Sequence, residues 1–257
     1  MILCLDVGNT NICGGVFYNE ELLLRFRYKT DTSYTSDQLG VFLKNVLREN
    51  SIEQKHLKSI AICSVVPAID YSMRAACKKY FDIEPFILQA DRKNNITIKT
   101  NNPQECGTDL IAGGIAAINL YPEKNIIVID FGTITTLTAI SKKHEFLGAA
   151  FLPGVRTTIQ TLGASAAKLF SVEILLPEKA VGRSTTESIQ SGVYYGHIGA
   201  IKEITAQIAQ EAFKEDPPII IATGGFCYLF ENKNLFNYIE PDLIFHGLKL
   251  SLLMNSK

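Results

Sequence analysis

The chain has 257 residues, of which 47% are hydrophobic and 20% charged, and its formal net charge is −1. A net charge near zero argues against binding to nucleic acid or to an anionic membrane. No apolar stretch approaches the roughly 18 residues that a transmembrane helix needs, and the N-terminus lacks the basic region of a secretory signal. We expect a cytoplasmic protein, long enough for two domains of about 125 residues.

The first half of the chain predicts three strands, then alternating helices and strands. A short separator at Asn19-Glu20 indicates a hairpin, so the first three strands should form an antiparallel meander. The capping-box residues 35–38 precede apolar residues at helical spacing. The predicted order is β-β-β-α-β-α-β, with elements at residues 2–5, 12–17, 22–26, 39–47, 60–63, 68–80 and 85–88.

The second half repeats this order. Apolar runs predict a second meander over 126–129, 135–140 and 146–152, and helical segments follow Pro153 and Ser184. The uniformly apolar run 219–222 is typical of a strand buried on both faces. Residues 90–106 are polar and long for a connection, which indicates a functional or mobile loop. We predict an N-terminal domain over residues 1–113 and a C-terminal domain over residues 114–257.

One short motif occurs in both halves. Residues 5–10 read Leu-Asp-Val-Gly-Asn-Thr and residues 129–135 read Ile-Asp-Phe-Gly-Thr-Ile-Thr, each after an apolar run and about half the chain apart. The Asp offers a carboxylate to a metal ion, and the Gly permits a tight turn whose N–H groups can face a phosphate. Either copy alone could be an ordinary strand-to-turn junction. The pair predicts a nucleotide held in a cleft between two related domains.

Other phosphate and metal signatures are absent from the sequence. No Gly is followed by Lys, which excludes a Walker-A loop, and no Gly-x-Gly-x-x-Gly occurs. The six cysteines contain no Cys-x-x-Cys pair, and the four histidines show no zinc spacing. A phosphate site must therefore come from the two repeated turns.

Duplicated units with a phosphate turn in each half resemble the actin, sugar-kinase and Hsp70 superfamily. Within it, seven segments resemble motifs of the type III pantothenate kinases, and they occur in that family's order. These segments are residues 6–11, 102–109, 130–136, 148–154, 182–188, 222–225 and 241–248.

The resemblance implies an α/β fold of two similar ribonuclease H-like domains, each a mixed sheet with helices on both faces. It implies ATP-dependent phosphorylation of pantothenate to 4′-phosphopantothenate, the first step of coenzyme A biosynthesis. The expected cofactors are Mg-ATP and a monovalent cation, K⁺ or NH₄⁺. The expected assembly is a homodimer, with no nucleic-acid or membrane partner.

The resemblance also assigns roles to residues. Asp109 would be catalytic, Asp130 would serve the monovalent cation, and Asp6 would serve the Mg-ATP side. The residues expected to bind ATP are Asp6, Val7, Gly8, Asn9, Thr10, Asn11, Thr133 and Gly224. The residues expected to bind pantothenate are Thr100, Gly107, Thr108, Leu110 and Thr185.

Two of these roles also follow from local chemistry. Asp109 lies at the start of a predicted helix, where the helix dipole favours a carboxylate. It is therefore either an ordinary N-terminal acid or the group that accepts the proton of the substrate hydroxyl. Thr185 follows the capping residue Ser184 at the start of a second predicted helix. It is therefore either an ordinary helix-start residue or a contact for a polar ligand, which the N–H groups of a helix N-terminus can bind.

The chain departs from the family pattern at three positions. Leu110 stands where the family generally has Arg, Thr100 where it usually has Tyr, and Thr138 where it often has Asp. The missing Arg predicts an altered grip on the substrate carboxylate. Two alternatives stay open: a kinase for another small hydroxylated metabolite, and a non-catalytic nucleotide-binding regulator of the same fold.

Overall fold

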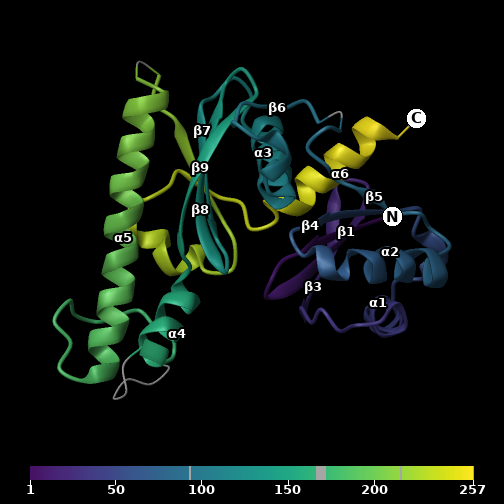
Figure 1. Ribbon diagram of the computed structural model, residues 1–257, viewed down its shortest axis with the longest axis horizontal. Helices are drawn as coiled ribbons and strands as arrows, with labels where there is room; N and C mark the ends of the chain where they lie inside the picture. Colours follow the sequence, from purple (N-terminus) through teal and green to yellow (C-terminus); the bar gives the residue numbers. More distant parts are fainter. Residues whose placement is uncertain (93, 166–171, 215, 257) are drawn as a thin grey trace. The chain divides into compact units, whose positions relative to one another are not determined.

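The computed structural model describes residues 1–92, 94–165, 172–214 and 216–256 (Figure 1). The chain forms two compact units. Unit 1 contains Met1–Ile96, Asn101–Ala116 and the chain from Leu243 onward, and unit 2 contains Thr97–Thr100 and Ala117–Asp242. Where the sequence predicted a single division after residue 113, the contacts show that the C-terminal segment returns to unit 1.

Unit 1 has a five-stranded sheet in the order β3-β2-β1-β4-β5. The first three strands are an antiparallel meander, and β4 and β5 extend it with parallel pairing. The predicted order β-β-β-α-β-α-β is confirmed. Its elements are β1 (Ile2–Val7), β2 (Asn11–Tyr18), β3 (Glu21–Lys29), α1 (Ser36–Glu49), η1 (Gln54–His56), β4 (Ser59–Ser64), α2 (Pro67–Phe81) and β5 (Phe86–Ile87).

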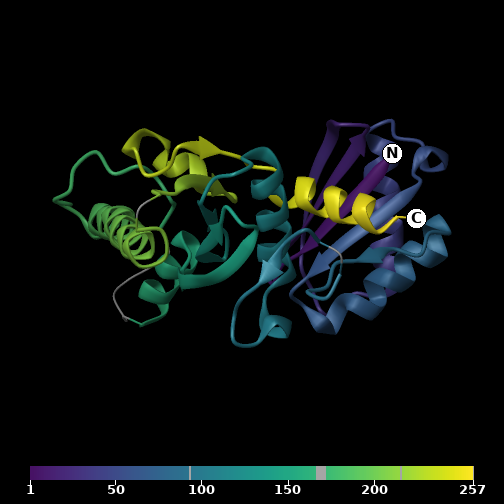
Figure 2. The ribbon, with the colours of Figure 1, turned by 90° about the horizontal axis from the view of Figure 1, so that it is seen from above.

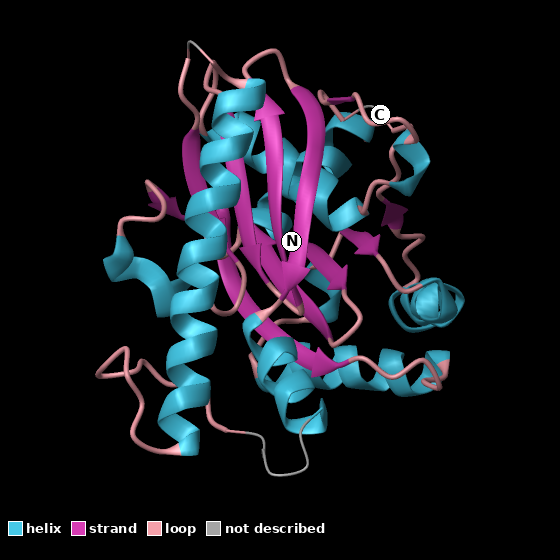
Figure 3. Ribbon diagram, turned by 60° about the vertical axis from the view of Figure 1, so that its left-hand side comes forward, coloured by secondary structure: helices cyan, strands magenta, loops and turns pink. Residues whose placement is uncertain are grey.

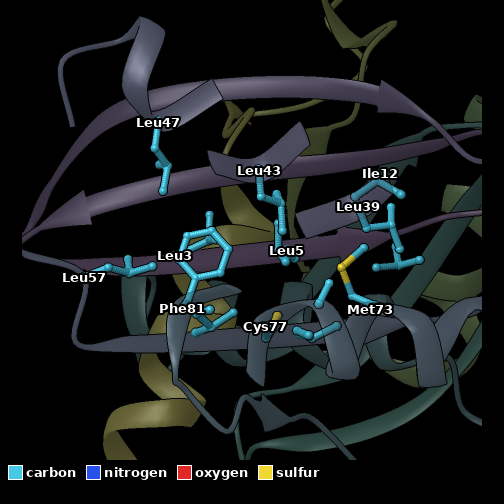
Figure 4. Close-up of a cluster of buried hydrophobic side chains, with 14 of the residues drawn as sticks. Leu3, Leu5, Ile12, Leu39, Leu43, Leu47, Leu57, Met73, Cys77 and Phe81 are labelled. Carbon is cyan, nitrogen blue, oxygen red and sulfur yellow. The ribbon is translucent and has the colours of Figure 1, made fainter. Parts of the chain in front are cut away.

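The core of unit 1 lies between its sheet and the helices α1 and α2. Leu3 and Leu5 of β1 meet the apolar side of both helices, as Figure 4 shows. Helix α1 begins at the predicted capping box: the Thr35 hydroxyl accepts the Gln38 N–H at 3.3 Å, and the Gln38 side chain accepts the Thr35 N–H at 2.9 Å. The apolar spacing and the cap thus place this helix on the sheet.

Helix α6 (Leu243–Asn255) covers the other face of this sheet. It contacts β1 and β4, and Figure 2 shows it running across the strands of unit 1. Because side chains alternate along a strand, Cys4 faces away from Leu3 and Leu5. Burial raises the pKa of the Cys4 thiol, and the nearby charge of Lys249 on α6 opposes that rise. Helices therefore lie on both faces of the sheet, as predicted.

A buried lysine ties α6 to the hairpin between β2 and β3. The Lys249 side chain is only 4% exposed, donates to the Asn19 carbonyl at 2.7 Å and pairs with the Glu20 carboxylate at 2.7 Å. A buried ammonium is tolerated only when it is paired in this way. The ion pair fixes the C-terminal helix to the N-terminal meander.

Unit 2 has a six-stranded sheet in the order β11-β10-β7-β8-β9-β6. The predicted second meander is confirmed, and β10 and β11 extend it with parallel pairing. Helix α5 runs along one face of the sheet (Figure 3). The elements are β6 (Thr97–Ile98), β7 (Ile126–Phe131), β8 (Ile134–Ser141), β9 (Glu145–Pro153), α4 (Val155–Ser165), α5 (Thr185–Ala212), β10 (Ile219–Thr223), η3 (Cys227–Lys233) and β11 (Tyr238–Ile239).

Two elements of unit 2 differ from a plain repeat of unit 1. The position of helix α2 is taken by the 3₁₀ segment η3. The polar stretch 90–106 is not entirely a loop, because β6 pairs with β9 and Pro103–Glu105 forms the short helix η2. Helix α3 (Thr108–Leu120) follows η2. Within the described ranges, no helix is long and apolar enough to cross a membrane.

Helix α6 approaches α3 so closely at Gly247 that no side chain fits between them. A Cβ at Gly247 would lie 1.8 Å from the Ala112 carbonyl oxygen, whereas a Cβ at Gly113 would have no closer neighbour than Leu243, at 3.9 Å. Gly247→Ala should lower the free energy of unfolding by about 1–3 kcal/mol, because the two backbones must separate. Urea unfolding measures this.

The matched control is Gly113→Ala on the facing helix. It adds the same methyl group at an ordinary van der Waals distance from Leu243 and should leave the stability unchanged or raise it by up to about 1 kcal/mol, since Ala favours a helix over Gly. Equal destabilisation by the two substitutions would contradict the close approach at Gly247.

Candidate functional site

The first repeated turn links β1 to β2 in unit 1. The Gly8 N–H donates to the Asn11 carbonyl at 3.0 Å, and the Thr30 hydroxyl donates to the Gly8 carbonyl at 2.6 Å. Asn9 and Thr10 at the tip are exposed. A Cβ at Gly8 would lie 3.2 Å from the Asn11 oxygen, so the turn is held tightly around a small residue. Its exposed tip is open to a ligand.

Asp6 lies just before this turn and beside a buried thiol. Its partner in register on β4 is Cys63, whose Sγ donates to Asp6 Oδ1 at 3.5 Å. Burial raises the pKa of the Cys63 thiol well above its usual value, and the charges of Asp6 and Asp109 raise it further. Asp6 therefore has a buried thiol as its direct neighbour on β4. Unit 1 contains both the first repeated turn and Asp109, and the hydroxyl of Thr108, beside Asp109, is hydrogen-bonded to Ser64 at the end of β4.

Asp109 occupies the first turn of α3 and is partly buried. Burial raises the pKa of its carboxyl group, and hydrogen bonds from the backbone N–H groups of Leu110 and of Asp109 itself oppose that rise. The Leu110 N–H donates to Oδ1 at 2.8 Å. A Cβ at Gly107 would lie 2.5 Å from the same oxygen, so the carboxylate occupies the space that a side chain there would fill.

The second repeated turn follows β7 in unit 2. Asp130 is paired in register with Thr136 on β8 and with Thr223 on β10. The next residue, Gly224, has φ +85, and a Cβ there would lie 2.2 Å from Asp130 Oδ1 and 2.7 Å from the Phe131 nitrogen. Only glycine allows both this backbone conformation and this approach. The predicted residues Asp130 and Gly224 are therefore direct neighbours.

Thr133 is held by the start of α4. Its carbonyl accepts the Gly154 N–H at 3.1 Å and the Thr157 hydroxyl at 2.7 Å. A Cβ at Gly154 would lie 2.6 Å from the same oxygen. The glycine-rich segment 148–154 thus ends directly on the second turn. Thr157 was not among the predicted site residues, because a threonine inside a helix carries no motif.

Thr185 lies at the N-terminus of α5, in an open pocket. The Ser184 hydroxyl accepts the Glu187 N–H at 3.2 Å, and the Glu187 carboxylate accepts the Arg183 N–H at 2.7 Å, which confirms the predicted helix start. The pocket has a volume of about 730 Å³. It is lined by polar residues of this loop and by apolar side chains of α4 and α5: Thr158, Leu162, Gly182, Arg183, Ser184, Thr185, Ser188, Ile189, Gly192 and Val193.

The predicted residues fall into three local groups. Residues 6–11 and 107–110 gather in unit 1, and Asp130, Thr133 and Gly224 gather in unit 2. Thr185 lies in its own pocket of unit 2. Thr100 also belongs to unit 2, just after β6, and its buried hydroxyl has no hydrogen-bond partner among the described residues.

Comparison with known proteins identifies the family. The sequence profile of the type III pantothenate kinases matches residues 2–207. The type III pantothenate kinase of Legionella pneumophila (strain Corby) is 55% identical over 256 residues, which cover 100% of both chains. Type III pantothenate kinase 1 of Francisella tularensis subsp. holarctica (strain OSU18) is 43% identical over 255 residues, covering 99% of this chain and 100% of that protein.

A solved structure supports the fold. The crystal structure of a conserved putative Baf family transcriptional activator from Campylobacter jejuni aligns with a TM-score of 0.62 over 98% of both chains. Its sequence is 20% identical, so this likeness concerns the fold alone. The full-length identity to named kinases confirms the predicted family. The chain belongs to the type III pantothenate kinases and catalyses the ATP-dependent phosphorylation of pantothenate in coenzyme A biosynthesis.

Proposed function

We propose that Asp109 is the base of this reaction and accepts the proton of the pantothenate hydroxyl as its oxygen attacks the γ-phosphoryl group of ATP. The observation that carries this proposal is the link between Asp109 and the first repeated turn: the hydroxyl of the adjacent Thr108 is hydrogen-bonded to Ser64, which pairs in register with Val7 where the turn begins. Phosphoryl transfer depends mainly on positioning and on charge neutralisation, so one oriented carboxylate beside the phosphates suffices for the proton.

Asp6–Asn11, Thr133 and Gly224 are proposed to hold ATP. The exposed turn tips offer N–H groups and hydroxyls to phosphate oxygens. The kinase family implies a divalent metal, and Mg²⁺ fits Asp6, because Mg²⁺ prefers one or two carboxylates together with phosphate oxygens and water. The described residues contain no cluster of three His, Cys, Asp or Glu, in keeping with an ion that arrives with its nucleotide. Bound Mg²⁺ supplies charge neutralisation on the phosphates.

Asp130 is proposed to serve a monovalent cation, K⁺ or NH₄⁺. Thr136 lies opposite Asp130 in register, and its buried hydroxyl has no hydrogen-bond partner among the described residues. Directly opposed residues of two strands point to the same face of the sheet. A carboxylate and an unsatisfied hydroxyl side by side provide oxygen ligands of the kind that a hard cation takes.

Pantothenate is proposed to contact Thr185, Thr100, Gly107 and Leu110. The pocket at Thr185 combines polar loop atoms with apolar side chains, which suits a substrate that has both polar groups and branched hydrocarbon. The orphan hydroxyl of Thr100 is available for a substrate hydrogen bond. Leu110 cannot supply the cation that the family generally has there.

The exposed face of α5 supports the proposed homodimer. Ser188, Gly192, Gly196 and Gly199 lie along this face, and Tyr195 is 39% exposed beside them. A Cβ at any of the three glycines would have no neighbour within 4 Å among the described residues beyond its own helix. Small residues let a second helix approach closely, and an exposed Tyr is a frequent interface anchor.

We place the enzyme in the cytoplasm, a reducing compartment that suits its six free cysteines.

Asp109→Asn tests the base. The substitution preserves size and the helix start but removes the proton acceptor, so kcat should fall roughly 100-fold or more. ATP affinity should be retained, because Asp109 is not among the residues proposed to hold ATP. The measurement is pantothenate-dependent ATP consumption in potassium buffer, with ATP binding followed by calorimetry.

A second readout comes from the raised pKa of Asp109. A buried carboxylate with a raised pKa costs stability above its unfolded-state pKa, where it must ionise inside the protein. At neutral pH, Asp109→Asn should therefore unfold at the same temperature as the parent or higher. An unchanged kcat, or a parent that consumes no ATP with pantothenate, would overturn the assignment.

Asp130→Asn tests the monovalent cation. Removing the charged ligand should abolish the activation of kcat by K⁺ over Na⁺ at constant ionic strength. The matched control is Asp216→Asn, which removes an exposed carboxylate of the same unit that pairs with Lys142. A parent-like K⁺ to Na⁺ ratio in Asp130→Asn would rule out this role.

Gly196→Arg tests the dimer face. A long charged side chain in the middle of the small-residue face should block a partner helix, so light scattering should report a monomer. Glu211→Arg, at the exposed end of the same helix, introduces the same side chain away from the glycines and should leave a dimer. A dimeric Gly196→Arg variant would place the interface elsewhere.

A further inference from the structure

The last residue of β4 has backbone groups that the sheet leaves unpaired. Strand β5 ends at Ile87, and its last pairing is the Leu88 N–H donating to the Ile62 carbonyl at 2.9 Å. Ser64 lies two residues further along β4, so its N–H and C=O point to the same side as those of Ile62, beyond the end of β5. Partly buried backbone groups in this position need partners.

The Thr108 hydroxyl satisfies both groups. Thr108 Oγ1 accepts the Ser64 N–H at 3.0 Å and donates to the Ser64 carbonyl at 3.0 Å. One side-chain oxygen thus substitutes for the missing strand and ties the first turn of α3 to the end of β4. Because the hydroxyl donates its only proton to the Ser64 carbonyl, it has none left to donate to another group.

Ser64 is itself fixed to its surroundings. It pairs in register with Val7, and the next N–H, from Val65, donates to the Val7 carbonyl at 3.1 Å. The Ser64 hydroxyl donates to the Asp70 carboxylate at 2.5 Å and accepts the Val66 N–H at 3.1 Å. Ser64 therefore joins the end of β1, where the phosphate turn begins, to the start of α2.

We propose that Thr108 is a positioning residue, whose hydroxyl fixes Asp109 relative to the phosphate turn by holding α3 on Ser64. The inference rests on the proposed role of Asp109 as the base. Thr108 was expected to bind pantothenate directly. The inference instead has it act through Asp109, because its hydroxyl is hydrogen-bonded to Ser64. Since a displacement of about 1 Å at a reacting group can cost about 100-fold in rate, a tie at the adjacent residue is sufficient to matter.

The test compares Thr108→Val with Thr108→Ser. Val keeps the shape but removes both hydrogen bonds, so kcat should fall between about 10-fold and 100-fold, while the KM values for ATP and pantothenate stay unchanged. Ser keeps the hydroxyl and should restore kcat. A rise in the KM for pantothenate with kcat unchanged would overturn the inference and make Thr108 a substrate contact.

A matched control separates positioning from general destabilisation. Ser251, on α6 of the same unit as Thr108, has a buried hydroxyl that donates to Asn94 Oδ1 at 2.6 Å. Ser251→Ala also deletes a buried hydrogen bond and should lower the Tm, with kcat unchanged. If Ser251→Ala lowers kcat as Thr108→Val does at the same loss of Tm, the positioning role is refuted. Should Thr108→Val fail to fold, Thr108→Cys, with weaker and longer hydrogen bonds, takes its place with the same criteria.

A double-mutant cycle shows whether Thr108 acts through Asp109. In single-turnover measurements, Thr108→Val should have no further effect in the Asp109→Asn background, because the group it positions is already absent. Multiplicative losses would overturn the inference. If Asp109→Asn alone leaves the rate intact, the base assignment itself fails. If Asp109→Asn is slow and Thr108→Val is not, the base stands and only the positioning role falls.

Discussion

The pairing of each central strand with a parallel neighbour is the constraint on which both sites depend. β1 lies between β2 and β4, and β7 lies between β8 and β10, so both strands are hydrogen-bonded on both edges. Asp6 and Asp130 are each the last residue but one of their strand. A carboxylate buried deeper in such a strand would carry a large desolvation cost. The strand ends are where a rigid sheet and a carboxylate can coexist, and both repeated turns follow there directly.

The sequence predicted the meanders and the main helices of both units, because their signals are local. Alternation, apolar runs and caps such as Thr35–Gln38 act over a few residues, and no distant contact overrides them. It did not predict that α6 would leave the second half and cover β1 and β4. That placement depends on the buried Lys249 and on the missing side chain of Gly247, which meet partners more than 100 residues away.

In the candidate site, too, the sequence predicted only residues that belong to a local motif. The motifs singled out Asp6, Asp109 and Asp130 as candidates, because a carboxylate beside glycine has a chemical signature. They did not identify Ser64, which is held through its backbone N–H and carbonyl, or Thr157, whose hydroxyl donates to a backbone carbonyl. Such contacts depend on where strands end in space, and a single sequence carries no periodic signal for them. The family assignment required the relatives, since spacing alone left other kinases and a regulator open.

The return of α6 to the first unit bears on how the protein is made. A ribosome releases the N-terminal meander first, when the face of β1 that carries Cys4 still lacks its covering helix. That cover is among the last segments to emerge, after the whole second unit. The first unit therefore completes its core only after unit 2 has left the ribosome, because Leu243 follows all the strands of unit 2 in the chain. The sheet that is translated before unit 2 is thus covered after it, and a nascent chain that stalls short of Leu243 exposes an apolar sheet face to chaperones.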